Sequence, residues 1–257
     1  MKTLRGQKLS QMPGYLWSAL SQSKHRGVCP VCTKRSIFVN LSDWQREHCR
    51  CIRCNSSSRG RALTQTLIET VPDWKQKTIL EFAPHGAVSG MLETSCSGYK
   101  GSVFLPDVTL GSEVNGRLNQ DLRALTLADE SYDIVISQDV FEHVFEPEKA
   151  FAELGRILKP GGVHIFTLPF NRHEKTRPRA VLNGEQVQHL LEPEYHGDPV
   201  NPSGTLVVTN WGYDICDLVF EASGMQTTYH SPQNEGLGIV GENLEVFVSK
   251  KPRPGRG

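Results

Sequence analysis

The hydrophobic and polar positions of residues 132–169 follow the pattern of one βαβ unit. Residues 133–137 (DIVIS) form a short apolar, β-branched run, which is typical of a strand buried on both faces of a parallel sheet. Apolar residues then recur every three or four positions over 150–158, and this spacing predicts an amphipathic helix that starts at Pro147. A Lys-Pro-Gly-Gly sequence ends the helix, and residues 163–168 predict the next strand.

Weaker patterns on both sides extend this unit. Residues 78–82 and 102–105 predict two earlier strands, and 246–248 alternate as a late strand does. Residues 210–223 predict a helix with Asn210 as its cap and Gly224 as its stop. Strands that alternate with helices predict an α/β fold with a doubly wound sheet.

The composition fits an ordinary folded protein and argues against a membrane protein. The chain has 257 residues, of which 38% are hydrophobic, so it can bury a core. It contains no apolar run near the ~18 residues of a membrane span, and its first residues lack the apolar centre of a signal peptide. We therefore expect a cytoplasmic protein.

A net charge of zero conceals a strong asymmetry. Residues 1–61 contain twelve Lys or Arg and two acids, so the remainder of the chain has sixteen basic and twenty-six acidic residues. Such a basic segment indicates either an anionic partner, nucleic acid included, or docking onto the acidic part of the chain. Arginines at 50, 53, 59 and 61 could bind phosphate or carboxylate groups, or could form a solvated face.

Four cysteines have the spacing of a zinc site. Cys29 and Cys32 form one C-x2-C pair, Cys51 and Cys54 form another, and eighteen residues separate the pairs. Cys49 is a less favoured alternative to Cys51, because it breaks the two-residue spacing. The segment has few apolar residues, so a structural Zn²⁺, which contributes an apparent ~10–16 kcal/mol in zinc-finger peptides, would stabilise a small zinc-ribbon-like module.

These observations divide the chain into successive parts. We expect a basic segment with the zinc module at 1–61, a linking helix at 62–77, a catalytic domain at 78–250 and a disordered tail at 251–257. Residues 169–205 are rich in His, Arg, Pro and Glu, and they follow a strand at the edge where such folds bind ligands. We expect this segment to be a substrate lid.

The sequence DIVISQDVFEHV, followed by AFAELGRILKPGG, resembles the second half of the catalytic domain in class I S-adenosylmethionine-dependent methyltransferases. It is most similar to the methyltransferase type 11 group that includes ubiquinone-type methyltransferases. The resemblance extends over about 78–250 and implies a Rossmann-like sheet, S-adenosylmethionine as cofactor, and methyl transfer to a small molecule or modified biopolymer. The alternative is a zinc-dependent nucleic-acid- or protein-binding module joined to a catalytically inactive methyltransferase-like domain.

The resemblance also implies cofactor residues. Glu81 matches the acid at the end of the first strand, although Pro84 and His85 replace the glycines usual in the following loop. Asp107 is placed near the ribose or is only a turn residue, and Asp121 is placed on the adenine. The full expected set is Glu81, Ala83, Pro84, Gly86, Asp107, Asp121, Leu122, Gln138 and Asp139.

The acceptor side has separate candidates. An acceptor that must lose a proton needs a base, for which we expect His196, then Glu194, then His143. His143 could instead serve packing and hydrogen bonding. Substrate contacts are expected from Tyr195, Arg172 and His173.

Overall fold

The computed structural model describes residues 24–184, 186–197 and 203–254, and these residues belong to two compact units. The first unit ends its main segment at Pro72 and adds residues 85–91 and 231–244. The second contains residues 73–84, 92–230 and 245 onward. These boundaries differ from the expected ranges, because two later segments of the chain belong to the first unit.

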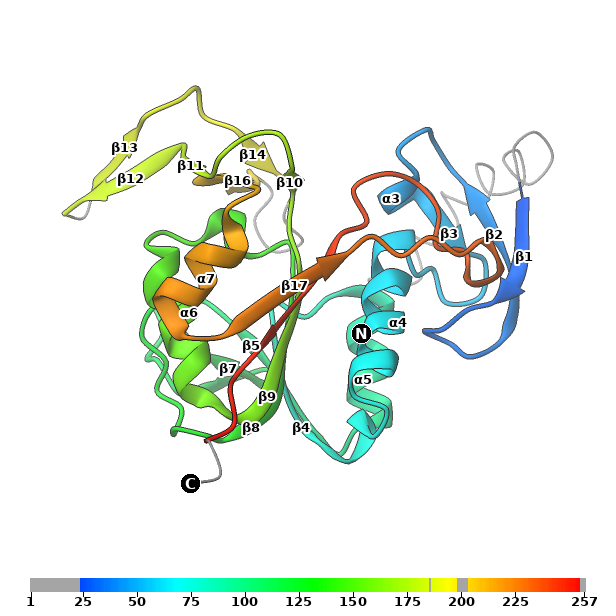
Figure 1. Ribbon diagram of the computed structural model, residues 1–257, viewed down its shortest axis with the longest axis horizontal. Helices are drawn as coiled ribbons and strands as arrows, with labels where there is room; N and C mark the ends of the chain where they lie inside the picture. The colour runs from blue at the N-terminus through cyan, green and yellow to red at the C-terminus, as the bar shows by residue number, and fades with distance from the viewer. Residues whose placement is uncertain (1–23, 185, 198–202, 255–257) are drawn as a thin grey trace. The chain divides into compact units, whose positions relative to one another are not determined.

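The first unit contains a small antiparallel sheet in the order β1-β2-β3 (Figure 1). Its elements are β1 Lys24–Val28, β2 Arg35–Asn40, α3 Gln45–His48, β3 Cys49–Cys51, α4 Ser58–Thr70 and η3 Glu235–Leu237. The helix expected at 62–77 starts earlier, because the Ser57 side chain caps α4 by accepting from the Gly60 N–H. α4 belongs to this unit, where Ser58 Oγ donates to the Val240 carbonyl at 2.7 Å.

The second unit contains an eight-stranded sheet in the order β17-β18-β9-β8-β4-β5-β7-β6. β4, β5, β7, β8 and β9 run parallel, whereas β18 is antiparallel to β9. The elements are β4 Thr78–Phe82, β5 Gly98–Val103, β6 Glu113–Val114, β7 Arg117–Asn119, β8 Tyr132–Gln138, β9 Leu158–Thr167, β17 Gln226–His230 and β18 Val246–Lys250. The short helix η1 Trp74–Gln76 precedes β4, and α5 Gly86–Ser95 follows it.

The predicted βαβ unit forms the centre of this sheet. α6 Pro147–Ile157 joins β8 to the parallel strand β9, as expected, and it lies beside α7 Ile215–Ser223 (Figure 1). The apolar stripe of α6 is buried in a core where the rings of Phe141 and Phe151 stack at 4.3 Å. The sequence predicted this unit because the buried stripe of α6 and the two buried strands accept mainly apolar residues.

Several expected boundaries are wrong. The second strand is 98–103 rather than 102–105, because a strand of glycine and polar residues has no apolar run to reveal it. β9 starts at Leu158, ahead of the Pro-Gly-Gly sequence, which lies in an irregularity of the strand. α7 begins after Asp214, and Asn210 belongs to β16 Thr209–Gly212 instead of capping the helix. Gly224 ends α7 with a φ of 71°, as predicted.

The expected lid is not an irregular loop, because short strands organise it. They are β10 Phe170–Asn171, β11 Arg177–Pro178, β12 Ala180–Asn183, β13 Gln186–His189, β14 Tyr195–His196 and β15 Thr205–Leu206. β10 and β11 both pair with β16, and β14 pairs with β15. These pairings attach the first part of the lid, residues 170–178, to β16.

The expected disordered tail begins with an ordered residue. The backbone N–H of Lys251 donates to the Gly162 carbonyl at 3.0 Å, so the chain stays attached to the irregularity in β9. Residues 255–257 lie outside the described part of the chain. Within the described ranges, no helix has the length and apolar character needed to cross a membrane.

Candidate active site and cysteine cluster

Glu81 lies at the carboxyl end of β4, buried to 1% exposure, and joins three strands of the sheet. Its carboxylate accepts a hydrogen bond from the Tyr99 hydroxyl at 2.7 Å and from Gln138 Nε2 at 3.1 Å. Burial, and then the Glu81 carboxylate, raise the pKa of Tyr99 far above its ordinary value. The predicted pair Glu81 and Gln138 is therefore brought together at the sheet edge where doubly wound folds bind ligands.

The loop after β4 has backbone geometry that is unusual for its residues. Ala83 has a φ of +49°, in the left-handed region, and its N–H donates to the Ser102 carbonyl at 2.9 Å. Pro84 follows, half-buried. Gly86 opens α5 with a φ of +69°, and a Cβ placed on it would meet nothing within 4 Å. Ala83 and Gly86 thus both have positive φ angles, although only Gly86 has the residue type expected of such a loop.

Asp139 and Asp121 are held by different partners. Asp139 has a φ of +51° just beyond β8, and its carboxylate accepts from the Thr167 hydroxyl at 2.9 Å. Asp121 forms an ion pair with Arg123, whose Nη2 is 2.7 Å from Oδ2. Burial would raise the pKa of Asp121, but the hydrogen bonds from Arg123 outweigh it and lower that pKa.

The remaining cofactor candidates have simpler environments. Leu122 is 7% exposed and belongs to the apolar core, so its backbone rather than its side chain could meet a ligand. Asp107 is exposed in a turn, where its carboxylate is accessible. The placement of Asp107 leaves both of its expected roles open.

Three side chains from two distant segments converge beside β8. Glu142 and His143 belong to the short helix η2 Phe141–His143, and His196 belongs to β14. Oε1 of Glu142 is 3.8 Å from His143 Nε2 and 3.7 Å from His196 Nδ1. The backbone N–H of Val208 donates to the Glu142 carbonyl at 2.7 Å, and this bond attaches the segment that follows the lid to η2. We call Glu142, His143 and His196 the Glu-His-His group.

The buried Glu142 carboxylate has few contacts that stabilise its negative charge. The Glu142 side chain is 1% exposed, and neither carboxylate oxygen has a hydrogen-bond partner among the described residues. Such a buried acceptor costs free energy unless a ligand satisfies it. Glu142 raises the pKa of His196 above its ordinary value of 6.5. His143 Nδ1 lies 2.8 Å from the Leu206 carbonyl, which requires a proton on Nδ1 and leaves Nε2 toward the group.

This geometry allows two kinds of chemistry. Separations of 3.7–3.8 Å are too long for a direct hydrogen bond, so a donor such as a hydroxyl group can be placed between the three side chains. All three ligand atoms also lie within 4.8 Å of one another, a spacing that could hold a divalent cation. Either occupant would satisfy the buried carboxylate.

The other acceptor-side candidates have their own partners. Glu194 is half-exposed, with Oε2 3.2 Å from Arg179 Nη2 and Oε1 3.5 Å from His196 Nε2. Tyr195 is 57% exposed. Arg172 is ion-paired with buried Glu245 at 2.5 Å, and the exposed His173 donates its backbone N–H to Asn171. The structure therefore brings together His196, Glu194 and His143, while it gives Arg172 a structural contact.

An apolar cavity of about 700 Å³ lies between α6, α7 and the lid strands. Val144 and Phe145, which directly follow His143 in the sequence, line this cavity together with Phe151, Leu182 and Trp211. Trp211 is 3% exposed, and its Nε1 has no hydrogen-bond partner within the described segments. The cavity therefore suits a ligand with an apolar body and one hydrogen-bond acceptor.

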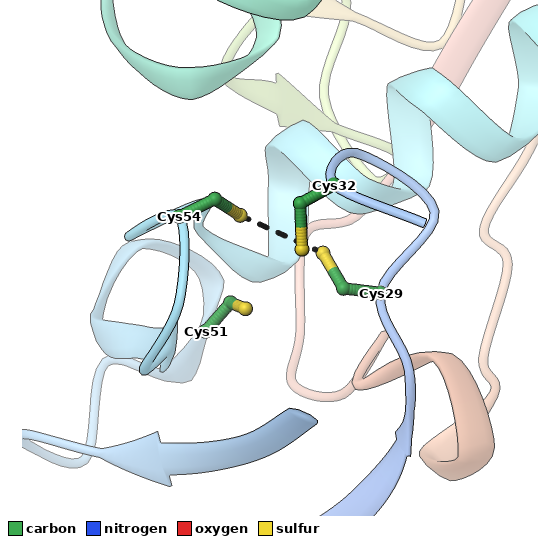
Figure 2. A group of neighbouring side chains, drawn as sticks. All are labelled: Cys29, Cys32, Cys51 and Cys54. Atoms are coloured by element: carbon green, nitrogen blue, oxygen red, sulfur yellow. Dashed lines mark hydrogen bonds between the residues drawn. The ribbon is translucent and has the colours of Figure 1, made fainter. Parts of the chain in front are cut away.

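The first unit contains a separate cluster in which the side chains of Cys29, Cys32, Cys51 and Cys54 point toward one another (Figure 2). The sulfurs of Cys29 and Cys54 are 3.7 Å apart. Two thiolates on one tetrahedral zinc, each bonded at about 2.3 Å, lie about 3.8 Å apart. The Ser56 and Ser36 hydroxyls contact these sulfurs at 3.1–3.4 Å, as outer hydrogen-bond partners of a metal site do.

Cys49 lies outside this cluster and contacts a buried arginine. Its sulfur is 3.4 Å from Arg61 Nη2, and the fully buried Arg61 side chain also donates to the carbonyls of Cys49, Ser56 and Gly238. Arg59 is likewise internal, because its Nε bonds to Glu47 at 2.5 Å. Arg59 and Arg61 are therefore neither a phosphate-binding pair nor a solvated face, and both expectations for them are wrong.

Sequence reasoning missed Glu142 as a site residue. Its acidic side chain precedes a histidine in the EHV element, but nothing in the sequence shows that the chain buries it without a partner. The signal that could have identified it is the combination of an acid beside a histidine at the end of a buried strand.

Comparisons with known proteins show which families this chain resembles. Residues 108–166 match the family described as methyltransferase domain. The ubiquinone biosynthesis O-methyltransferase of Coxiella burnetii (strain Dugway 5J108-111) is 27% identical over 160 residues, covering 60% of this chain and 63% of that protein. The enzyme of the same name from Aliivibrio fischeri (strain MJ11) is 25% identical over 119 residues, 46% of this chain and 47% of that one. The chain thus spans less than two thirds of the length of these relatives.

A solved structure shows the same fold. The S-adenosylmethionine-dependent methyltransferase from Mesorhizobium loti is matched with a TM-score of 0.50 at 13% identity, over 76% of this chain and all of that one. The second unit therefore has the fold of class I S-adenosylmethionine-dependent methyltransferases, and its residues 108–166 match the methyltransferase domain family.

Proposed function

We propose that the protein transfers a methyl group from S-adenosylmethionine to a hydroxyl group of its acceptor. The observation that supports this most strongly is the Glu-His-His group, in which a buried carboxylate without a hydrogen-bond partner faces two histidines beside the sheet edge. The cofactor edge has matching features, since Glu81 and Gln138 are hydrogen-bonded there and Ala83 adopts a left-handed conformation.

Bound S-adenosylmethionine supplies an electrophilic methyl group whose bond to sulfur breaks as the sulfur takes the electron pair. The protein has to align the acceptor oxygen with that methyl group, exclude water and accept the hydroxyl proton. Neutral His196 accepts this proton, and the adjacent Glu142 carboxylate stabilises the positive imidazolium that results. Alignment of two reactants can supply roughly 7–11 kcal/mol of the barrier reduction.

The acceptor class follows from the surroundings of the Glu-His-His group. The 700 Å³ cavity that begins at Val144 would hold an apolar part of the acceptor, with the Trp211 indole N–H as a donor to it. The relatives named ubiquinone biosynthesis O-methyltransferase act on oxygen according to their names, which is the same reaction class. We infer a hydroxylated acceptor with a hydrophobic portion.

The first unit adds a structural role for a metal. We propose that one Zn²⁺ binds Cys29, Cys32, Cys51 and Cys54, because their sulfur spacing fits tetrahedral thiolate zinc. The fully buried Phe38 is the largest apolar side chain of the small sheet, so the metal would replace a core that this sheet lacks.

Methyl transfer can be tested without knowing the acceptor. Protein and S-adenosylmethionine labelled in the methyl group are incubated with extract fractions of small molecules, RNA and protein. We expect label to enter an organic-extractable fraction, and the variants Glu142→Gln and His196→Gln to reduce incorporation by ~10²-fold or more. The exposed His189→Gln serves as the matched control. Absence of label from every fraction, together with absence of cofactor binding, would favour a catalytically inactive domain.

A further inference from the structure

The three-stranded sheet of the first unit has one buried face and one basic face. Side chains alternate between the two faces along each strand. Ser36, Phe38 and Cys51 are buried on one side. On the other side, the strand register places Arg26 beside Ile37 and Val28 beside Arg35, and Ile52 continues the row by donating its N–H to Ile37. Val39 and Arg50 also pair on this side, but Val39 is 1% exposed, so the exposed surface does not extend over it. We call the outward residues the ribbon face: Arg26, Val28, Arg35, Ile37, Arg50 and Ile52.

The ribbon face combines exposed cations with exposed apolar side chains. Val28 is 45% exposed and Ile52 is 53% exposed, which is high for residues of this type within a sheet. Arg26 and Arg35 are exposed around them. Arg53 adds a further guanidinium, because its Nε donates to the Arg35 carbonyl at 2.7 Å. Apolar surface therefore lies between fixed positive charges.

None of these cations is neutralised by an acid among the described residues. The unit contains Glu47, but Arg46 and Arg59 occupy that carboxylate. No carboxylate lies within ion-pair distance of Arg26, Arg35, Arg50 or Arg53 in the described ranges. Residues 1–23 contain three cations and no acid, so their charge does not complement the face either. The positive charge of the ribbon face therefore favours binding of an anionic partner.

We propose that the ribbon face binds single-stranded nucleic acid. Arg26 and Arg35 are diagonal neighbours on adjacent strands, about 7–8 Å apart, so their long side chains can reach successive phosphates. The planar guanidinium fork binds phosphate through two hydrogen bonds and also stacks on bases. Val28 and Ile52 would pack against the base faces, which are accessible in a single strand but stacked on one another inside a duplex.

Fluorescence anisotropy of the full-length, zinc-loaded protein with a labelled, mixed-sequence RNA of about 20 nucleotides tests this proposal, since typical single-strand sites cover ~4–16 nucleotides. The test variant is Arg26→Gln with Arg35→Gln, whose side chains make no hydrogen bond among the described residues. The control is Lys75→Gln with Lys250→Gln, two exposed cations of the second unit. Zinc content should be the same in all three proteins.

The arginine variant should bind at least ~10-fold more weakly at moderate salt. Its log-log salt slope should be shallower by about 1.4, because each phosphate contact on a single strand contributes ~0.7. Ile52→Asn should weaken binding without changing the slope. Equal losses in the arginine and lysine variants, no binding at low salt, or a preference for duplex or for anionic lipid vesicles would overturn the proposal.

Discussion

His196 Nδ1 lies 3.7 Å from Glu142 Oε1, although β14 and η2 are far apart in the sequence. His196 lies in the lid strand β14, and Glu142 lies in η2, just after the end of β8. The Glu142 carboxylate is buried with no hydrogen-bond partner among the described residues, and His196 is half-buried beside it. Their convergence is the reason to assign acceptor chemistry to this point of the fold.

The first prediction concerns the titration of His196. Because Glu142 raises the pKa of His196, a two-dimensional NMR titration should give a value above the ordinary 6.5. Glu142→Gln should bring it down toward 6.5, whereas the exposed Glu192→Gln should leave it unchanged. A His196 pKa below 6.5 in the unmodified protein would contradict the assigned pairing.

The same pair predicts how stability depends on pH. The folded-state pKa of His196 is raised, so its pairing with Glu142 stabilises the protein below about pH 6.5 and this contribution disappears as the pH rises through the folded-state pKa. The loss of unfolding free energy in His196→Gln should therefore be larger at low than at high pH. Denaturant titrations of both proteins across this range measure it, and an equal loss at every pH would remove the charged pair from the account.

The third prediction concerns zinc binding by the four-cysteine cluster of the first unit. The unmodified protein should contain one zinc per chain by elemental analysis, and Cys51→Ser should release it, because Cys51 belongs to the four-sulfur cluster. Cys49→Ser should retain zinc, since that sulfur contacts Arg61 instead. Clearly less than one equivalent in the unmodified protein, or metal loss in both variants, would require a different ligand set.

Divalent cations give a related test of the Glu-His-His group. If a proton-accepting His196 is sufficient, methyl transfer should be unaffected by a chelator weak enough to leave the thiolate zinc bound. If the group holds a cation, activity should fall with the chelator and return on addition of magnesium, manganese or zinc ions. Retained activity at constant zinc content is the outcome expected here.

The core beneath the site should be sensitive to truncation. Phe151 is 1% exposed and stacks on Phe141 at 4.3 Å, so Phe151→Ala should cost about 3–5 kcal/mol of unfolding free energy. Urea unfolding followed by tryptophan fluorescence can detect it, since the Trp211 ring is 6.0 Å from Phe151. Phe220→Ala, at a position 55% exposed, is the control and should change stability little.

The sequence predicted the elements whose burial restricts residue type. β8 and α6 were readable because both faces of the strand and one stripe of the helix are buried. The clustering of the four cysteines was also predicted, because two C-x2-C pairs are typical of four-cysteine zinc sites. β5 and the start of α7 were misplaced, since polar residues occupy β5 and Asp214 rather than Asn210 precedes the helix.

The site was harder to predict than the fold, because its central relationship is a tertiary one. His196 and His143 were proposed from residue type and position in the chain, but the lack of a hydrogen-bond partner for the Glu142 carboxylate depends on burial in the folded chain. The ion pair between Arg172 and Glu245, which directly precedes β18, was not readable from the sequence for the same reason. A partner distant in sequence leaves no local pattern.

Calorimetric titration of the full-length protein with S-adenosylmethionine tests the central claim most directly. We expect one binding site per chain, weakened by roughly 10- to 150-fold in Glu81→Gln, because that change disrupts the buried carboxylate joined to Tyr99 and Gln138, at a cost of about 1.5–3 kcal/mol. His196→Gln should bind the cofactor as tightly as the unmodified protein, since its role is on the acceptor side. No binding heat with the unmodified protein, confirmed by equilibrium dialysis, would contradict the account.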